Sequence, residues 1–438
     1  MLRIYFYNKF GNSEYSELVR KLVRAQHPIG SRDSEVHSII RATGQFVEDI
    51  IARYFHDLSR HLPIISRTRF YNNLISLGAA PADDFSVLLL AICLITRTPA
   101  LGYRPEDDSP RPAEQQSLYL NAKSLFAQIQ VSCPPSITLV QAGLLLAVYE
   151  YTHSRPDDAF VTIAGVARLA YAAGIHTRQI PMTGAASRNI DTDSLLRAEE
   201  AANTWWGIII CEREVEVQSQ PLLTTFPDSD ARLPIEPRLL DRLDIESDAL
   251  PNIALSCLTS PQLGGFSRFA QATSLLDQVF KAFSIPDTDS RLLLLDRLDT
   301  SLHSFLSLVM PQCPGQEGAF CASINTAIRA LFILHSQILS LRPQTVRALF
   351  RPIDDWHKRA SEALDTITKM VVDIGETLVA DMSTVDGMPP MWPYVVRAAL
   401  KHLSSSSGRE NNGWMETAEE ILKTSLSKYL RRWGISEE

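Results

Sequence analysis

The sequence lacks most of the residue patterns by which enzymes and cofactor-binding modules are recognised. Gly-x-Gly-x-x-Gly, Gly-x-x-x-x-Gly-Lys, His-Glu-x-x-His and Gly-x-Ser-x-Gly do not occur in its 438 residues. These patterns place phosphates on glycine-rich loops, hold zinc on one helix face, or expose a nucleophilic serine. We therefore expect no enzyme activity, no catalytic residues, no cofactor and no metal site.

Cysteines are few and widely spaced. Six occur, at positions 93, 133, 211, 257, 313 and 321, and no two form a Cys-x-x-Cys unit. Buried free thiols are the usual state of such residues in proteins that are not secreted. We therefore expect an intracellular protein with neither a disulfide framework nor a cysteine-based metal site.

The sequence also lacks a long apolar run and an excess of positive charge. Its longest apolar run, Phe85 to Ile95, is closed by Arg97 and falls short of the roughly 20 residues of a membrane span. The formal net charge is -8, whereas nonspecific affinity for nucleic acids comes mainly from clustered Lys and Arg. These features predict no membrane association and no nonspecific affinity for DNA.

Apolar residues recur at spacings of three and four along most of the chain, and strict alternation is nearly absent, which favours helices. No segment repeats at a fixed period, which disfavours a repeat protein. We predict an all-α fold: a single large irregular helical domain of about a dozen helices over residues 46–438, after a poorly committed N-terminal segment, 1–45. The predicted helices are 46–60, 67–77, 83–97, 115–131, 136–152, 157–174, 194–217, 266–282, 289–310, 320–341, 354–380, 393–406 and 412–433.

The segment around residues 166–178 places an arginine and a histidine beside small apolar residues. Gly174 is suited to cap a helix in the left-handed conformation. Because a partly buried arginine is normally kept by pairing, we expect Arg168 to form an ion pair between helices, with a carboxylate such as Glu150 or Glu212. His176, just beyond the cap, is expected to hydrogen-bond free carbonyls.

The hairpin of which this segment is part, LVQAGLLLAVYEY (139–151) followed by DDAFVTIAGVARLAYAAGIH (157–176), resembles the central signature of the fungal-specific transcription factor domain. Further stretches agree in order: 51–70, 199–234, 388–403 and 413–434. The resemblance thus spans nearly the whole chain after residue 45. The residues that match the family's motifs, and to which it gives structural roles, are Tyr54, Phe55, Pro63, Arg168, Gly174, His176, Trp205, Trp206, Arg213 and Pro221.

Two departures from the family's pattern stand out. Ala201, Ala202 and Asn203 replace the arginines that usually precede the Trp pair, and Ser219-Gln220-Pro221 replaces Gly-Arg-Pro. The family's DNA-binding module holds two zinc ions with six closely spaced cysteines, and residues 1–45 contain no cysteine. We therefore expect no sequence-specific DNA binding by this chain itself.

The resemblance implies a nuclear transcriptional regulator without catalysis, of a fungal metabolic or biosynthetic pathway. We expect it to act through its helical domain, by pairing with a zinc-cluster transcription factor or a second copy of itself, or by sensing a small-molecule effector. Two alternatives stay open: a helical scaffold without a transcriptional role, and a truncated gene model of a complete zinc-cluster factor. An enzyme built on this fold would need a pocket with convergent polar groups.

Overall fold

The computed structural model describes residues 32–75, 83–97, 111–177, 192–215, 222–240, 251–260, 263–313, 318–341, 352–380, 387–406, 413–433 and 435. Within these ranges the regular structure is helical, and β-pairing is limited to an isolated bridge between Arg232 and Ala254. The predicted all-α fold is confirmed. In chain order the helices are α3 (Arg32–Ala42), α4 (Val47–His56), η1 (Leu58–Arg60), α5 (Arg67–Ile75), α6 (Asp83–Thr96), α7 (Arg111–Ser132), α8 (Ile137–Thr152), α9 (Pro156–Ala172), η3 (Ile175–Thr177), α10 (Thr192–Glu214), α11 (Pro237–Leu240), α12 (Gly265–Phe283), α13 (Thr288–Val309), η6 (Met310–Gln312), α14 (Cys321–Ser340), α15 (Ile353–Ala380), α16 (Trp392–Ser406) and α17 (Gly413–Arg432).

The N-terminal end of the described chain departs from the predicted helices. The helix predicted over 46–60 ends at His56 and continues as the short η1. The additional helix α3 packs on α6 and buries Val36 and Ile40 completely. Core residues therefore occur before residue 46, while the domain boundary placed there stays a prediction.

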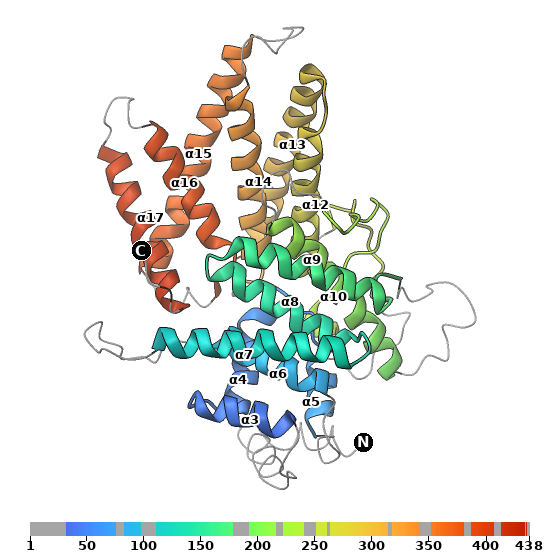
Figure 1. Ribbon diagram of the computed structural model, residues 1–438. Coiled ribbons are helices and arrows are strands. Elements are labelled where there is room, and N and C mark those ends of the chain that lie inside the picture. The colour runs from blue at the N-terminus through green and yellow to red at the C-terminus, as the bar shows by residue number, and fades with distance from the viewer. Residues whose placement is uncertain are drawn as a thin grey trace.

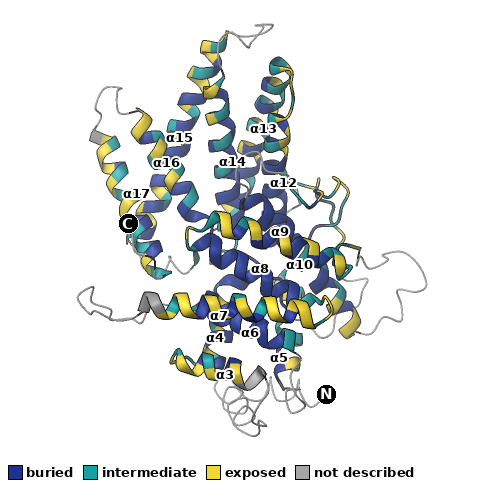
Figure 2. Cartoon of the chain, in the orientation of Figure 1, coloured by how far each residue is buried: buried dark blue, intermediate teal, exposed yellow. Residues whose placement is uncertain are grey.

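Two central helices, α6 and α8, organise the first apolar core. Every residue of α6 from Phe85 to Thr96 is buried, and so is every residue of α8 from Leu139 to Thr152. A helix that is apolar on all sides must be surrounded. The surrounding helices are α3, α4, α7, α9 and α10. Figure 2 shows α6 and α8 in dark blue behind α7, whose outer face is exposed.

A second apolar core lies among α12 to α17. In Figure 1, α13, α14 and α15 run side by side towards the top of the view, and α16 and α17 flank α15. Helix α12 belongs to both cores. Its Phe266 and Phe269 lie in the first core, and Leu276 and Val279 lie in the second. The two halves of the molecule therefore share a continuous helix.

Close helix packing in the first core depends on glycine. A Cβ atom added at Gly143 of α8 would lie 2.6 Å from Cγ2 of Val166 on α9 and 2.8 Å from Cζ of Phe126 on α7. Such distances are below van der Waals contact, so a neighbour has to move. Gly165, on the outer side of α9, is exposed, and nothing lies within 4 Å of its added Cβ.

These two glycines predict opposite effects of the same substitution. Gly143→Ala overpacks the core and is expected to lower the free energy of unfolding by about 1–3 kcal/mol. Gly165→Ala improves helix propensity without a clash and is expected to raise it by about 0.5–1 kcal/mol. Urea denaturation followed by circular dichroism measures both. Equal effects of the two variants would contradict the packing described.

Candidate functional site

Helix α10 carries a stripe of buried polar residues along its length. Glu199, Glu200, Asn203 and Thr204 occupy its first half, and Glu212, Arg213 and Glu214 end it; all are buried. Buried polar groups are costly unless they are hydrogen-bonded. The partners of these residues lie on connecting segments and neighbouring helices, so α10 fastens parts of the chain that are distant in sequence.

The first half of the stripe holds two connecting segments. The Asn203 side chain donates to Pro63 O (3.1 Å) and Ile235 O (2.9 Å) and accepts from Ile235 N (3.1 Å). Thr204 Oγ1 lies 3.2 Å from Ile64 O. The connecting segments that contain Pro63 and Ile235 are thus fixed to α10 through their backbone groups. The asparagine at 203 is therefore more than a departure from the family's arginines, because its amide satisfies three backbone groups.

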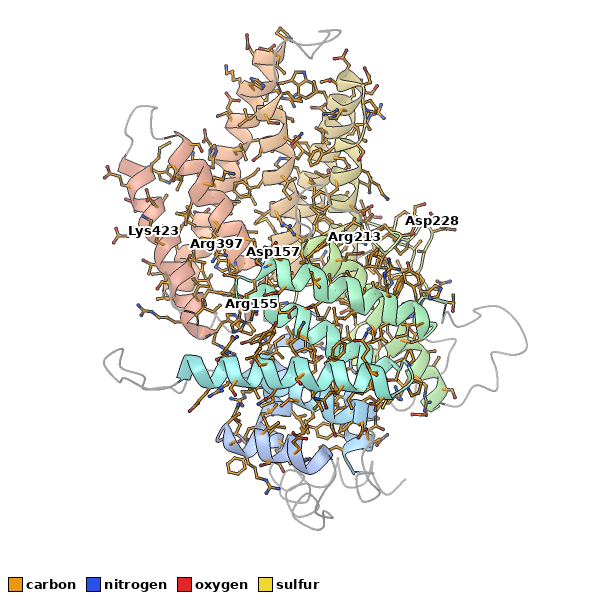
Figure 3. All side chains as sticks on the ribbon, in the orientation of Figure 1. Arg155, Asp157, Arg213, Asp228, Arg397 and Lys423 are labelled. Atoms are coloured by element: carbon orange, nitrogen blue, oxygen red, sulfur yellow. The ribbon has the colours of Figure 1, made fainter. Side chains whose placement is uncertain are left out.

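The second end of α10 is a buried charge cluster around Arg213. The Arg213 guanidinium lies 2.8 Å from Glu212 Oε2 and 3.1 Å from Asp277 Oδ1 of α12, and it donates to Thr224 O at 2.7 Å. Leu223 N donates to Glu212 Oε1 at 2.6 Å. Figure 3 places Arg213 in the region where α10 packs on α12. We name Glu212, Arg213, Thr224 and Asp277 the junction cluster.

The next residue of α10 extends these contacts into the second core. Glu214 Oε2 lies 2.7 Å from Arg329 Nη1, and Glu214 Oε1 accepts from Thr326 Oγ1 at 2.5 Å. Arg329 Nη1 also donates to Glu214 O at 2.6 Å. Both partners belong to α14. The end of α10 is therefore bound by charge to α12 and α14 together.

A cavity of about 260 Å³ lies at the opposite end of α10. Its polar lining includes Arg69 of α5 and Glu200 of α10, which form an ion pair, and Gln141 of α8. Burial raises the pKa of Glu200, which Arg69 and the amide of Ser66 oppose. We name this cavity the α10 pocket. Its lining residues are Ile65, Arg69, Phe70, Asn73, Phe85, Leu88, Pro135, Ser136, Ile137, Thr138, Gln141, Arg197 and Glu200.

The first family-motif residues in the chain, Tyr54 and Phe55, lie in the first core near this pocket. Tyr54 is completely buried, and its ring meets the Phe55 ring edge-on, with centroids 5.1 Å apart. Phe55 contacts Phe70, whose ring lies 5.0 Å from that of Phe85. Phe70 and Phe85 line the α10 pocket. Pro63 is buried beside α10 and contributes the carbonyl bound by Asn203.

The Trp pair faces two sides of α10. Trp206 is buried, its Nε1 donates to Arg232 O at 3.3 Å, and its ring meets Phe226 edge-on. Trp205 is half-buried and contacts Tyr171 and His176. Both tryptophans therefore stabilise packing, and neither lines the α10 pocket.

The predictions made for residues at the end of the α8–α9 hairpin are confirmed in part. Gly174 has a φ of 67°, the left-handed conformation predicted for the end of α9. The His176 ring packs against Tyr171 with centroids 4.7 Å apart, and its buried Nδ1 has no hydrogen-bond partner among the described residues. The expected hydrogen bonds to carbonyls are therefore not formed in the described chain, because the ring is turned towards aromatic neighbours.

The ion pair expected of Arg168 is not formed among the described residues. Its side chain is exposed on α9, and within the described ranges it meets no carboxylate. Glu150 is held instead by Lys123 (2.8 Å) and Tyr119 (2.7 Å), and Glu212 by Arg213. The position of Arg168 on the outer face of α9 points it away from both carboxylates. Pro221 lies outside the described residues.

Among the described residues, no helix is both long and apolar enough to cross a membrane, and no group of three or more His, Cys, Asp or Glu side chains is placed to hold a metal ion. All six cysteines are free.

The sequence model of the fungal specific transcription factor domain matches residues 51–369. The chain belongs to this family. Transcription factor BOA15 from Botryotinia fuckeliana (strain B05.10) is 31% identical over 138 residues, which cover 32% of this chain and 72% of the relative. The resemblance inferred from the sequence is confirmed, and the chain is a transcriptional regulator. A transcription factor domain is not an enzyme class.

The matched residues of the transcription factor domain include both ends of α10. The lining of the α10 pocket, the junction cluster and Arg329 all lie between residues 51 and 369. The stretches 388–403 and 413–434 lie beyond the match, so their likeness to the family stays a prediction.

The transcription factor domain provides a matched test with two arginines. Arg213→Ala leaves buried Glu212 without its cation and Asp277 with Lys281 alone, and is expected to lower the free energy of unfolding by about 3–5 kcal/mol. Arg168→Ala removes an exposed side chain and is expected to change it by less than about 0.5 kcal/mol. Chemical denaturation measures both variants. A loss at Arg168 as large as that at Arg213 would refute these assignments.

A buried histidine makes the stability of the domain depend on pH. His61 Nε2 lies 3.1 Å from Gly387 O, and burial lowers the pKa of His61 from 6.5 to about 4. Between these values the unfolded chain binds more protons than the folded one, so the free energy of unfolding falls as pH falls from 6.5 to 4. The shift corresponds to a loss of up to about 3 kcal/mol.

The variant His61→Gln removes this titration while keeping a side-chain donor. Its free energy of unfolding is expected to fall less than that of the wild type between pH 6.5 and pH 4. Denaturation curves at these two pH values measure the difference. His56→Gln is the control, because His56 is 69% exposed. If His61→Gln retained the full pH dependence, the assignment would be wrong.

Proposed function

We propose that the chain is a nuclear transcriptional regulator of a fungal metabolic or biosynthetic pathway, whose helical domain acts by binding an effector and by associating with a DNA-binding partner. The observation that carries the effector part is the α10 pocket. It combines a partly buried ion pair, Arg69 and Glu200, with apolar walls, as small-molecule sites do.

The helix that lines the pocket supports a regulatory role. Glu200 contributes to the pocket, and Arg213, on the same helix, binds Asp277 of α12. Glu200 and Arg213 are thirteen positions apart, which corresponds to about 20 Å of helix. A ligand at one end of α10 therefore acts on an element that also holds the other core.

The partner part of the proposal rests on composition. The given sequence contains no run of closely spaced cysteines, and its formal net charge is -8. We propose that a partner makes the sequence-specific DNA contacts, and that this chain pairs with a zinc-cluster transcription factor or with a second copy of itself. Membership in the family supports the proposed nuclear localisation.

Tethering tests the proposed regulatory function. The chain is fused to the DNA-binding domain of a bacterial repressor and expressed in a fungal cell with a reporter gene under the matching operator. We expect reporter output to change severalfold relative to the DNA-binding domain alone, in either direction. The same fusion carrying Arg213→Ala, whose junction cluster is broken, is expected to lose the effect. An unchanged reporter with a folded, nuclear fusion protein would contradict the proposal.

A further inference from the structure

The effector class can be narrowed from the donors and acceptors of the α10 pocket. We propose that the pocket binds a small organic monocarboxylate, with a single ring or a short aliphatic chain as its apolar part. The inference rests on the proposed function only in treating this ligand as the effector. That the ligand binds is argued from the residues of the pocket alone.

The pocket has an excess of hydrogen-bond donors. Arg69 Nη1 donates to Glu200, and Arg69 Nε lies 3.5 Å from Asp193 Oδ1. Arg197 Nη2 donates to Asp193 Oδ2 at 3.0 Å. Nη2 of Arg69 and Nε and Nη1 of Arg197 have no acceptor among the described residues. A guanidinium carries five N–H donors, so both arginines can accept a further anion.

The two carboxylates beside the arginines, Glu200 of the lining and the neighbouring Asp193, are already engaged. Glu200 Oε1 accepts from Ser66 N at 2.9 Å, and Glu200 Oε2 accepts from Arg69. Asp193 is shared by both arginines. A cationic ligand would have to displace Arg69 from Glu200 in a buried setting, whereas a carboxylate meets free donors. The unused N–H donors of the two arginines therefore favour an anionic ligand.

The apolar lining and the size of the pocket indicate what the apolar part of the ligand is. Six apolar side chains line it: Ile65, Phe70, Phe85, Leu88, Pro135 and Ile137. Its volume of about 260 Å³ is ample for several water molecules. This space suits one ring with an acidic arm, or a short fatty acid. Arginines and aromatic rings in the same lining predict an amphipathic acid.

Calorimetric titration of the full chain tests the proposal directly. The probes are benzoate, phenylacetate and hexanoate, in a buffer free of carboxylates, and benzamide serves as the uncharged counterpart of benzoate. We expect at least one acid to bind with a one-to-one stoichiometry and benzamide to bind about tenfold to a hundredfold more weakly, the range for a lost charged hydrogen bond. Absence of binding by all three acids, or equal binding of benzoate and benzamide, would overturn it.

Variants assign the binding to this pocket. Arg197→Gln is expected to weaken the acid about tenfold or more, and because Arg197 is 54% exposed the variant should fold normally. Arg397→Gln, an exposed arginine of α16 that donates to Ser154 Oγ at 3.0 Å, is the matched control and should bind as the wild type does. Equal losses in both variants, or no loss at Arg197, would place the site elsewhere and refute the proposal.

The failure of this inference is distinguishable from the failure of the proposed function. A chain that binds no acid but still changes reporter output when tethered refutes the ligand class alone. A chain that binds the acid through Arg197 but leaves the tethered reporter unchanged refutes the regulatory role and keeps the site.

Discussion

The buried guanidinium of Arg213 is the constraint on which the arrangement of the two cores depends. A buried cation without partners is strongly unfavourable, so its surroundings must supply carboxylates and carbonyls at fixed distances. Here they come from α10 itself, from Asp277 of α12 and from Thr224. The ion pair between Glu214 and Arg329 adds α14. Three helices and one connecting segment are thereby held in register, which apolar contacts alone specify poorly.

The same principle explains why α10 is rich in polar residues although it lies inside the molecule. Asn203 and Thr204 bind the backbone of Pro63, Ile64 and Ile235, which have no helical partner of their own. A connecting segment buried against a core must find hydrogen bonds for its backbone. An apolar α10 would bury more carbon surface but leave the Pro63 carbonyl and the backbone of Ile235 without these partners. The polar stripe therefore allows irregular segments to be packed tightly between helices.

The sequence predicted the helices well because their periodicity is local, and it identified Gly174 because a left-handed cap is a local property too. It could not separate Arg168 from Arg213. Both lie in helices rich in apolar residues, and the difference arises from Asp277, 64 residues beyond Arg213, which no local pattern reveals. The α10 pocket was missed for a related reason. Its charged residues, Arg69 and Glu200, are 131 positions apart, and each alone resembles an ordinary residue near a helix end.

The position of the α10 pocket limits how a ligand there can act on the second core. A ligand shifts an equilibrium only by as much as it prefers one arrangement over another. The pocket offers such a preference, because an anion bound to the free donor of Arg69 adds a second negative charge beside Glu200, whose own charge is stabilised by that arginine. Weakening this pair loosens one attachment of α10 to α5. Since the other end of α10 is bound by charge to α12 and α14, the helix cannot shift without straining or carrying those contacts. Any signal from the pocket must therefore reach the second core as a movement of α10 against α12.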